Sequence, residues 1–488
     1  MASALTHKLL RDVLHLRGQV IAISLVVACG VAVVVTSRTA YESLLISQQT
    51  YYADFRFADI FAGLKRAPES VAARLGAIPG VGVVQTRIVF DVTLDVPGLD
   101  EPATGRLISV PERQRPLLND LYIRRGRYIE PGRRDEVLVG EAFATANRLD
   151  VGDSFGAILN GRWERLRITG IVLCPEFVYE IRGGDIFPDN RRFGVLWMSR
   201  DAMGPAFSLD GAFNDVALSL APGAREADVI AAVDRELERY GGLGAFGRSD
   251  QTSNRFLSDE IAQNRISGTI IPAIFLSVAA FLLNIVLSRV DRQQRDQIAV
   301  HTAFGYAHVA DGLHYVPFAL LDVLPGAVLG VSLGLWLGSL INRRYVQFYR
   351  FPVLRYEAGV EVIALATGVA VSAALGGAWR AVRTALALPP AEAMRPEQPQ
   401  RFHAGWLEHS GMAFAVAILI IGRYFVDAIE HIAEVQFRIV QRDDLTVSFQ
   451  NPLALRVRHD LARLPGVIRT ESFRAVPVRL RQEHRSRR

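Results

Sequence analysis

The sequence at residues 19–36 is QVIAISLVVACGVAVVVT, and the sequence at residues 266–288 is ISGTIIPAIFLSVAAFLLNIVLS. Each stretch is apolar and long enough for a helix to cross the hydrocarbon core of a bilayer, which takes about 20 residues. The residues between them are polar and mixed in composition. The predicted frame of the fold is therefore a helix that enters a membrane, a large water-facing domain and a helix that returns.

Three further apolar stretches follow at residues 315–341, 359–379 and 411–429. Arg423 and Asp427 interrupt the last of them, which makes it the weakest of the five. Helices satisfy their own backbone hydrogen bonds inside a bilayer, so apolar stretches of this length predict membrane-spanning helices. The predicted fold class is an α-helical integral membrane protein with about five transmembrane helices and a large α/β domain outside the membrane.

The segment between the first two spans carries both strand and helix signals. Residues 81–96 are rich in β-branched side chains, residues 165–172 alternate, and residues 136–139 form a short apolar run, which predicts strands. Residues 141–148 and 224–240 have the apolar spacing of helices. This mixture predicts a folded α/β domain, built as one domain or as two small lobes.

The arginine-rich composition argues against two classes of binding protein. The net charge is +5, and the only lysines are Lys8 and Lys65. A phosphate-binding P-loop needs a lysine next to a glycine, and no Gly-Lys pair occurs, so the chain does not bind ATP through that motif. The arginines form no basic stripe with interleaved aromatic residues, which argues against nucleic-acid binding.

The residues typical of catalytic and metal sites do not cluster. His308 and His314 stand apart and predict no metal site. No Gly-x-Ser-x-Gly elbow supports serine catalysis. Cys29 and Cys174 lie in different environments and cannot form a disulfide framework. We therefore expect no enzyme activity in this chain and no cofactor bound to it.

The third apolar stretch contains a carboxylate, Asp322, close to Pro317 and Pro325. A carboxylate at that depth costs roughly 3 kcal/mol on insertion scales, so we expect it to face protein or water. A hydrogen-bonded packing role at a proline kink is favoured over a relay or a substrate contact, and both stay open. Glycines in the same stretch repeat at a spacing that allows close contact with another span, in this chain or in a second subunit: Gly326, Gly330, Gly334 and Gly338.

The chain also repeats itself. Leu75 and the run Ile78–Val81 are echoed by Leu461 and the run Leu464–Val467, each after an apolar stretch. A second copy of the span and the external domain is therefore predicted to begin near Gly411, and we expect this copy to be incomplete.

Several separated motifs, taken in order, resemble the FtsX-like permease family with a MacB-type periplasmic core domain. Two of them follow predicted spans, Arg295–Ala299 with Ala303–Tyr306, and Pro390–Pro396. Three more lie in the external domain: Asp135–Val137, Gly152–Asp153 and Cys174–Phe177. The chain departs from the family pattern at Gln297, where a glutamate is usual, and at Thr302, where a basic residue is common.

The resemblance implies a permease subunit of an ABC-type transporter in the bacterial inner membrane, with several spans. A separate ABC ATPase would use the ATP, and the permease would couple hydrolysis to transport or mechanotransmission for lipid, lipoprotein, peptide or drug export. Other expected partners are the lipid bilayer, a second permease chain or the missing C-terminal half, and a periplasmic adaptor. Two alternatives stay open: a signalling or scaffold protein that regulates a periplasmic cell-wall hydrolase without transport, and an inactive truncated permease.

With this orientation, the predicted division of the chain is a cytoplasmic amphipathic helix (1–18), transmembrane helix 1 (19–36), a MacB-like periplasmic core domain (37–265), transmembrane helix 2 (266–288), a cytoplasmic coupling segment (289–314), transmembrane helix 3 (315–341), a short periplasmic loop (342–358), transmembrane helix 4 (359–379), a cytoplasmic linker (380–410), transmembrane helix 5 (411–429) and the start of the second periplasmic domain (430–488). The positive-inside rule does not support this orientation, because the predicted periplasmic loop carries as many basic residues as either cytoplasmic loop: Arg343, Arg344, Arg350 and Arg355.

Two cytoplasmic segments are the candidate contacts with the ATPase. A short helix with an apolar tip can insert into a groove on a partner while flanking charges set its orientation. The coupling segment supplies such residues: Arg292, Arg295, Asp296, Gln297, Ile298, Ala303, Phe304 and Gly305. The motif after helix 4 consists of Pro390, Glu392, Ala393, Met394, Arg395 and Pro396.

Overall fold

A computed structural model of the chain divides into two units, Met1–Met394 and Arg395–Arg488. In the first unit it describes residues 17–182, 188–303, 308–353 and 359–387. In the second unit it describes residues 420, 423–424, 426–440, 443, 445–447, 449, 453–473, 480–482 and 485–487. The predicted helix at residues 1–18 therefore lies almost wholly outside the described residues, and so does most of the predicted span at residues 411–429.

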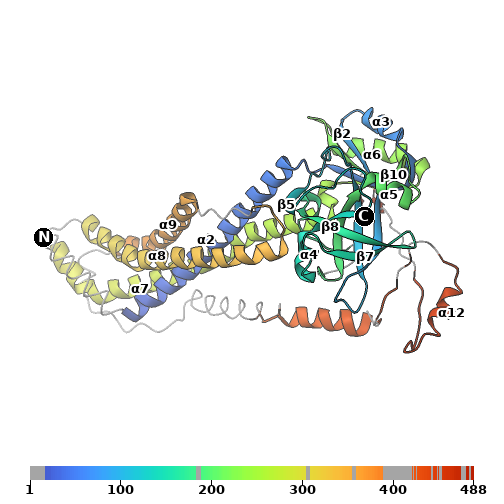
Figure 1. Ribbon diagram of the computed structural model, residues 1–488. Coiled ribbons are helices and arrows are strands. Elements are labelled where there is room, and N and C mark those ends of the chain that lie inside the picture. The colour runs from blue at the N-terminus through green and yellow to red at the C-terminus, as the bar shows by residue number, and fades with distance from the viewer. Residues whose placement is uncertain are drawn as a thin grey trace. The chain divides into compact units, whose positions relative to one another are not determined.

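The first unit contains four long helices among its described residues: α2 (Arg17–Asp54), α7 (Thr252–Ala303), α8 (His308–Phe348) and α9 (Val360–Ala387). They form a bundle in which α2 packs along both α7 and α8, and α9 also lies against α7 and α8 (Figure 1). Three described stretches are long and apolar enough to cross a membrane, Arg17–Asp54, Thr252–Ile285 and Ala319–Phe348, and Val360–Gly376 is a shorter apolar helix. The predicted count of about five spans is thus not confirmed.

Glycines bring α2 and α8 into near backbone contact. A Cβ added at Gly330 would lie 2.7 Å from the carbonyl oxygen of Ala28, and one added at Gly334 would lie 2.7 Å from Cβ of Val35. The hydroxyl of Thr36 donates to the carbonyl oxygen of Gly334 at 3.1 Å. The predicted small-residue contact is therefore confirmed, and its partner is α2 of the same chain.

The larger sheet of the α/β domain closes on itself. Its strands lie in the order β5-β8-β6-β9-β4-β3-β7, and β7 also pairs with β8, so that six of the seven strands form a ring. The strands are β3 (Val89–Asp95), β4 (Ala103–Val110), β5 (Tyr122–Gly126), β6 (Glu136–Gly140), β7 (Ser154–Leu159), β8 (Arg162–Leu173) and β9 (Phe193–Ser199).

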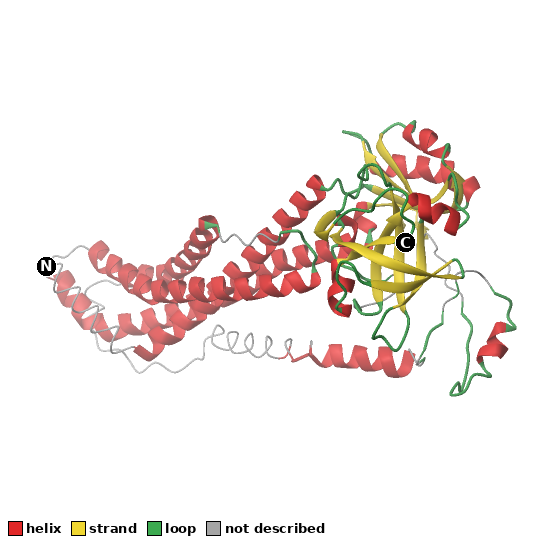
Figure 2. Ribbon diagram, in the orientation of Figure 1, coloured by secondary structure: helices red, strands yellow, loops and turns green. Residues whose placement is uncertain are grey.

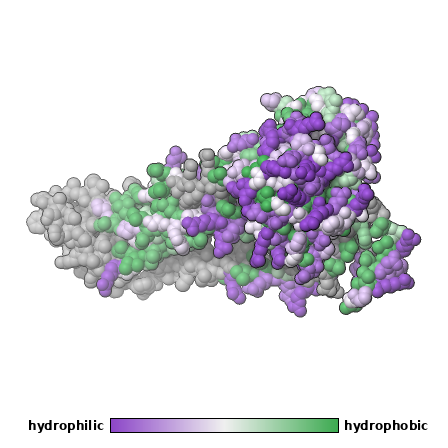
Figure 3. Space-filling model, in the orientation of Figure 1, coloured by the Kyte–Doolittle hydropathy of each residue, from purple (hydrophilic) through white to green (hydrophobic). Residues whose placement is uncertain are grey.

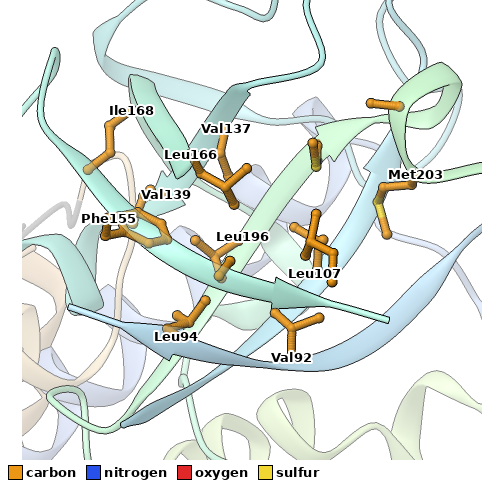
Figure 4. Close-up of a cluster of buried hydrophobic side chains, with 14 of the residues drawn as sticks. Val92, Leu94, Leu107, Val137, Val139, Phe155, Leu166, Ile168, Leu196 and Met203 are labelled. Carbon is orange, nitrogen blue, oxygen red and sulfur yellow. The ribbon is translucent and has the colours of Figure 1, made fainter. Parts of the chain in front are cut away.

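Buried aliphatic and aromatic side chains fill this ring. Leu94, Leu107, Phe155 and Leu196 come from four different strands and converge in its interior (Figure 4). Alternation along each strand sends every second side chain inward, which is why short runs of mixed apolar and polar residues suffice to form a closed core. The short helices α4 (Glu141–Asn147) and α5 (Arg200–Ala206) border the ring.

A second, smaller sheet has the order β11-β1-β10-β2, with all pairs antiparallel. Its strands are β1 (Ile60–Pro68), β2 (Val81–Arg87), β10 (Ala212–Leu220) and β11 (Gly242–Gly247). Its core includes residues of α3 (Val71–Gly76) and α6 (Glu226–Leu237). Within the first unit, the strands gather beyond one end of the helix bundle (Figure 2). The α/β domain therefore consists of two lobes, one of the two arrangements left open by the sequence.

Most local predictions in this domain are confirmed. Residues 136–139 and 165–172 are strands, in β6 and β8, and residues 141–147 form α4. The stretch 81–96 forms two strands of different sheets, β2 and β3, which separate at Ile88. The apolar spacing at residues 224–240 is that of α6, followed by a short 3₁₀ turn, η2 (Glu238–Tyr240).

Helical structure does not mark the predicted limits of the membrane spans. The limits at residues 36 and 266 fall inside α2 and α7, which continue without interruption. The predicted periplasmic loop at residues 342–358 needs a correction, because α8 extends to Phe348 and residues 342–348 are helical. The loop prediction failed there because Tyr345 and its neighbours pack against other elements, which favours continued helix over a solvated turn.

The second unit holds η4 (Val435–Val440, a π-helical segment), α12 (Val457–Leu461), β12 (Leu480–Gln482) and β13 (Arg485–Arg487). The predicted repeat has the same local geometry in both copies. Gly80 and Gly466 have φ angles of +93° and +88°, and the next backbone N–H donates three residues back at 3.1 and 3.2 Å. A left-handed glycine therefore lies in a turn that follows a short helix in each copy. The start of a second, incomplete periplasmic domain at residues 430–488 stays a prediction.

Candidate functional site

Three helices of the bundle meet the α/β domain at one apolar cluster, which we call the junction. The end of α2 contributes Tyr51, the start of α7 contributes Leu257, and the segment after α8 contributes Tyr349 and Phe351. Edge-to-face ring contacts connect it, with Tyr51 5.0 Å from Phe55 and 6.1 Å from Phe351 between ring centroids. Its remaining buried members are Leu44, Tyr52, Phe57, Ala58, Phe61, Leu118, Leu173, Val178, Ala217 and Ile261.

The segment after α8 is fixed to the domain by its backbone. Arg124 of β5 donates through Nη1 to the carbonyl oxygen of Pro352 at 2.9 Å and through Nη2 to that of Phe351 at 3.1 Å. The same guanidinium donates from Nε to Glu141 at 3.0 Å. The backbone N–H of Arg350 donates to the carbonyl oxygen of Val178 at 2.8 Å. A displacement of the end of α8 is therefore passed directly to the closed sheet.

Hydrogen bonds between polar side chains connect the helices to one another where they approach the α/β domain. The Tyr52 hydroxyl on α2 donates to Asn254 Oδ1 on α7 at 3.0 Å. The Tyr345 hydroxyl on α8 donates to Glu260 Oε1 on α7 at 2.6 Å and accepts from Asn264 Nδ2 at 2.9 Å. Because α7 takes part in both contacts, α2, α7 and α8 are held together where they approach the domain.

A buried arginine joins the smaller sheet to the 3₁₀ turn that follows β8, next to the junction. Arg87, at the end of β2, pairs with Glu176 in η1 (Pro175–Phe177) and donates from Nε to Asp215 of β10 at 2.8 Å. The carboxylate of Glu176 also accepts from Asn119 Nδ2 at 2.8 Å. Burial alone would lower the pKa of Arg87, but Asp215 and Glu176 outweigh it and hold that pKa above its ordinary value.

The network around Arg87 reaches both helix ends. Asn119 Oδ1 accepts from the backbone N–H of Ala58, just after α2, at 2.8 Å. Gln251, just before α7, donates to the carbonyl oxygen of Glu176 at 2.7 Å. Arg87 therefore stabilises the contact between the lobes and the entry points of two helices at once.

A buried carboxyl, Glu180, lies beside the segment after α8. Its side chain is buried, and its Oε2 has no hydrogen-bond partner among the described residues. Burial raises the pKa of Glu180 to about 8, although Arg350 and the backbone N–H of Ala142 lower it, and Glu141 raises it further. Glu180 is therefore mostly protonated at neutral pH, and Arg350 instead approaches Glu141 at 3.8 Å.

The raised pKa of Glu180 predicts a pH-dependent stability. The pKa of Glu180 is about 8 in the folded chain and 4.5 in the unfolded chain. The contribution of Glu180 to the free energy of unfolding is therefore fully present below pH 4.5 and is lost as pH rises through about 8. Glu180→Gln, a neutral isostere, should remove this loss, on the order of a few kcal/mol. Unfolding midpoints of the full chain in detergent across that pH range measure it.

The matched control is Glu101→Gln, since the Glu101 side chain is 63% exposed. This variant should keep the pH profile of the wild type. A profile for Glu180→Gln that coincides with the wild type would show that Glu180 does not carry the effect.

The sequence-predicted coupling residues lie on the same helix as part of the junction. Residues 292–298 and Ala303 belong to α7, whose first turns contribute Leu257 to the junction, and the helical stretch expected at Val290–Phe304 is helical as far as Ala303. Asp322 lies within α8. Phe304, Gly305 and the motif at residues 390–396 lie outside the described residues.

Sequence reasoning missed the residues that make the junction. Arg124, Glu260 and Tyr345 were not singled out, and Glu180 was interpreted only as part of a solvated acidic loop after Pro175. The four-residue spacing of Tyr345 and Tyr349 next to an apolar span was an available signal, since aromatic residues with a polar atom are typical of helix ends near an interface. The other three carry no such pattern, because their partners are distant in sequence.

The segment that links the junction to the predicted coupling residues is also the segment shared with known proteins. Residues 269–390 match the family FtsX-like permease C-terminal. This match covers most of α7, together with α8 and α9. No curated protein shows a significant match to the chain.

Two solved structures similar to this chain are the extracellular domain of the noncanonic ABC-type transporter YknZ from Gram-positive bacteria and the periplasmic region of MacB from Actinobacillus actinomycetemcomitans. The first is 11% identical with a TM-score of 0.25, over 38% of this chain and 97% of the other. The second is 10% identical with a TM-score of 0.26, over 42% and 92%.

The family match and the apolar helices indicate a membrane protein. The match supports a permease subunit of an ABC-type transporter, and the family implies a partner ATPase. It also suggests a non-enzymatic membrane subunit. Among the described residues no group of histidine, cysteine and carboxylate side chains could hold a metal ion.

Proposed function

We propose that this chain is the inner-membrane permease subunit that transmits the ATP-driven motion of a separate ATPase to its periplasmic α/β domain. The observation that carries the proposal is the continuity of α7, which runs from the junction at Thr252 to the predicted coupling residues ending at Ala303. At a rise of about 1.5 Å per residue, this helix is roughly 75 Å long. One element thus joins the predicted site of ATPase contact to the external domain.

Contacts at and near the junction connect α7 to its neighbouring helices and to the α/β domain. Asn254 and Glu260 bind α7 to α2 and α8, and Arg124 binds the segment after α8 to the closed sheet. A shift or tilt of α7 therefore displaces the domain together with its neighbours and does not dissipate at a flexible linker. Pro272 lies within α7 and removes one backbone hydrogen bond, which offers a point where the helix can bend.

The finer parts of the function rest on the family resemblance. We propose a lipid, lipoprotein, peptide or drug as the exported substrate, with ATP used only by the partner. Transport and mechanotransmission differ in their output: the first moves a compound across the membrane, and the second changes the activity of a periplasmic partner. An export assay and a cell-wall hydrolase assay on the same membranes distinguish the two.

Charge reversal in the coupling segment tests the contact with the ATPase. Arg292→Glu together with Arg295→Glu should reduce the ATPase that co-purifies with the tagged full-length chain by at least about tenfold, because a like-charge contact costs more than 1.4 kcal/mol at a complementary interface. Quantitative mass spectrometry of the co-purified proteins and ATP hydrolysis in the same sample measure the loss.

A matched control reverses one exposed charge far from that segment. Arg225→Glu lies just before α6 in the α/β domain, where its side chain is 84% exposed, and should leave the ATPase bound. Wild-type amounts of ATPase with the doubly reversed chain would contradict the coupling role of α7, and no ATPase with the wild type would contradict the proposed function.

A further inference from the structure

Four arginines lie on three helices of the bundle, toward the α/β domain. Arg38 is on α2, Arg265 is on α7, and Arg343 and Arg344 are on α8, and all four are exposed. We call them the arginine belt. Arg38 pairs with Glu42 at 2.8 Å, while the other three make no ion pair within the described part of the chain.

The packing of the helices puts the belt at one level. Gly268 of α7 lies against Ser37 of α2, so Arg265 and Arg38 are within a turn of each other along the bundle. Gly334 of α8 lies against Val35, and the two helices run in the same direction, so Arg343 and Arg344 follow about two and a half to three turns beyond that contact, toward the α/β domain. At about 1.5 Å per residue, the four arginines fall within about 10 Å of one another along the axis.

The surface changes character at this level. On the face drawn in Figure 3, the described part of the helices is largely apolar and the α/β domain is largely polar. On the side of the belt away from the α/β domain, exposed apolar side chains include Ile270 of α7 and Leu333 of α8, and Trp336 of α8 is 61% exposed. Exposed tryptophans are typical of the membrane–water interface. The belt therefore lies toward the domain end of this apolar surface, with Val346 and Phe348 of α8 exposed just beyond it, at a level that suits a headgroup layer about 5–8 Å thick.

We propose that the arginine belt binds the phosphate groups of anionic phospholipids in the leaflet that faces the α/β domain. A guanidinium presents two parallel N–H donors that match a phosphate, and a long side chain reaches several ångströms along the bundle. A positive cluster in which three of four arginines form no ion pair within the described part of the chain recruits anionic lipids over neutral ones. This inference rests on the membrane placement in the proposed function, and it adds a lipid partner and a site for it.

The test compares bilayers that differ only in headgroup charge. The full chain is reconstituted in nanodiscs of phosphatidylcholine, with or without added phosphatidylglycerol, and its unfolding midpoint is measured in both. We expect the anionic lipid to raise the midpoint of the wild type by several degrees and native mass spectrometry to show retained phosphatidylglycerol. The combined change Arg265→Gln, Arg343→Gln and Arg344→Gln should abolish both effects.

Two further variants separate the lipid contact from folding. Arg162→Gln with Arg165→Gln and Arg225→Gln removes the same charge from exposed positions of the α/β domain and should keep the wild-type shift. Lysines at the three belt positions should restore most of it, because the positive charge returns. If the glutamine variant fails to fold in neutral lipid, the wild type is measured at increasing salt concentration instead. The rise in its unfolding midpoint caused by phosphatidylglycerol should then decrease as salt increases.

Three results would overturn the inference. The first is a glutamine variant whose unfolding midpoint still rises with phosphatidylglycerol as much as that of the wild type, and the second is an α/β-domain control that loses this rise as the glutamine variant does. The third is inorganic phosphate in neutral nanodiscs that raises the wild-type midpoint as much as phosphatidylglycerol does. The last would assign the site to soluble phosphate. Co-purification of the ATPase is measured on the same variants. A chain that binds no ATPase but keeps the lipid shift contradicts only the proposed function, and the reverse contradicts only the arginine belt.

Discussion

Arg87→Met is expected to destabilise the α/β domain by about 3–5 kcal/mol, because removing one partner of a buried ion pair leaves the other charges without compensation. Only 7% of the Arg87 side chain is exposed, and it contacts both Glu176 and Asp215. Burial already raises the pKa of Asp215 although Arg87 opposes this, so loss of Arg87 makes its ionised form still less favourable. Hydrogen exchange of peptides from β2 and β10 in the full-length chain measures the loss.

Two controls distinguish the buried charge from the size of the side chain. Adding Glu176→Gln and Asp215→Asn to Arg87→Met removes the uncompensated charges and should recover much of the stability. Arg192→Met breaks an exposed pair with Glu101 and should cost about 0–1 kcal/mol. Similar losses for Arg87→Met and Arg192→Met would contradict the role of burial.

Gly330→Val is expected to separate α2 from α8. The first added carbon alone would lie 2.7 Å from the carbonyl oxygen of Ala28 and from Cβ of Val31. Overpacking typically costs about 1–3 kcal/mol, and here backbone must move to relieve it. Resistance of the purified chain to unfolding by sodium dodecyl sulfate, followed by proteolysis of the released helices, measures this loss.

The chain offers a matched control in another helix. Gly368 of α9 has no atom within 4 Å of an added Cβ, so Gly368→Val should change stability only by the difference in helix propensity, a few tenths of a kcal/mol. Equal sensitivity of the two variants to detergent would mean that the contact between α2 and α8 does not hold the bundle together.

Local patterns in the sequence predicted much of what lies within a single element. The strands at residues 136–139 and 165–172, the helix at residues 141–147 and the glycine face of α8 follow from the side chains themselves and their immediate neighbours. A helical stretch was also predicted at Val290–Phe304, and α7 is helical there as far as Ala303, while α8 continues as a helix to Phe348, into the predicted loop.

The junction could not be predicted in the same way, because its contacts join residues far apart in the sequence. Tyr345 and Glu260 are 85 residues apart, and Arg124 lies 228 residues from Pro352. Nothing near Glu180 in the sequence shows that it is buried, since burial depends on which elements pack over it. The closed form of the larger sheet likewise depends on a pairing between β7, the last strand in its order, and β8, the second strand.

The sequence by itself determined the apolar helices, the strand-rich domain between them and the spacing of small residues, because these depend on residues within a few positions of one another. The sequence did not show which of the arginines after the third apolar stretch are exposed and which are buried. Arg343 and Arg344 stay exposed on α8, whereas Arg350 is largely buried beside Glu141 and Glu180. Only the tertiary structure separated them, because the role of a charged side chain is set by the groups that fold against it.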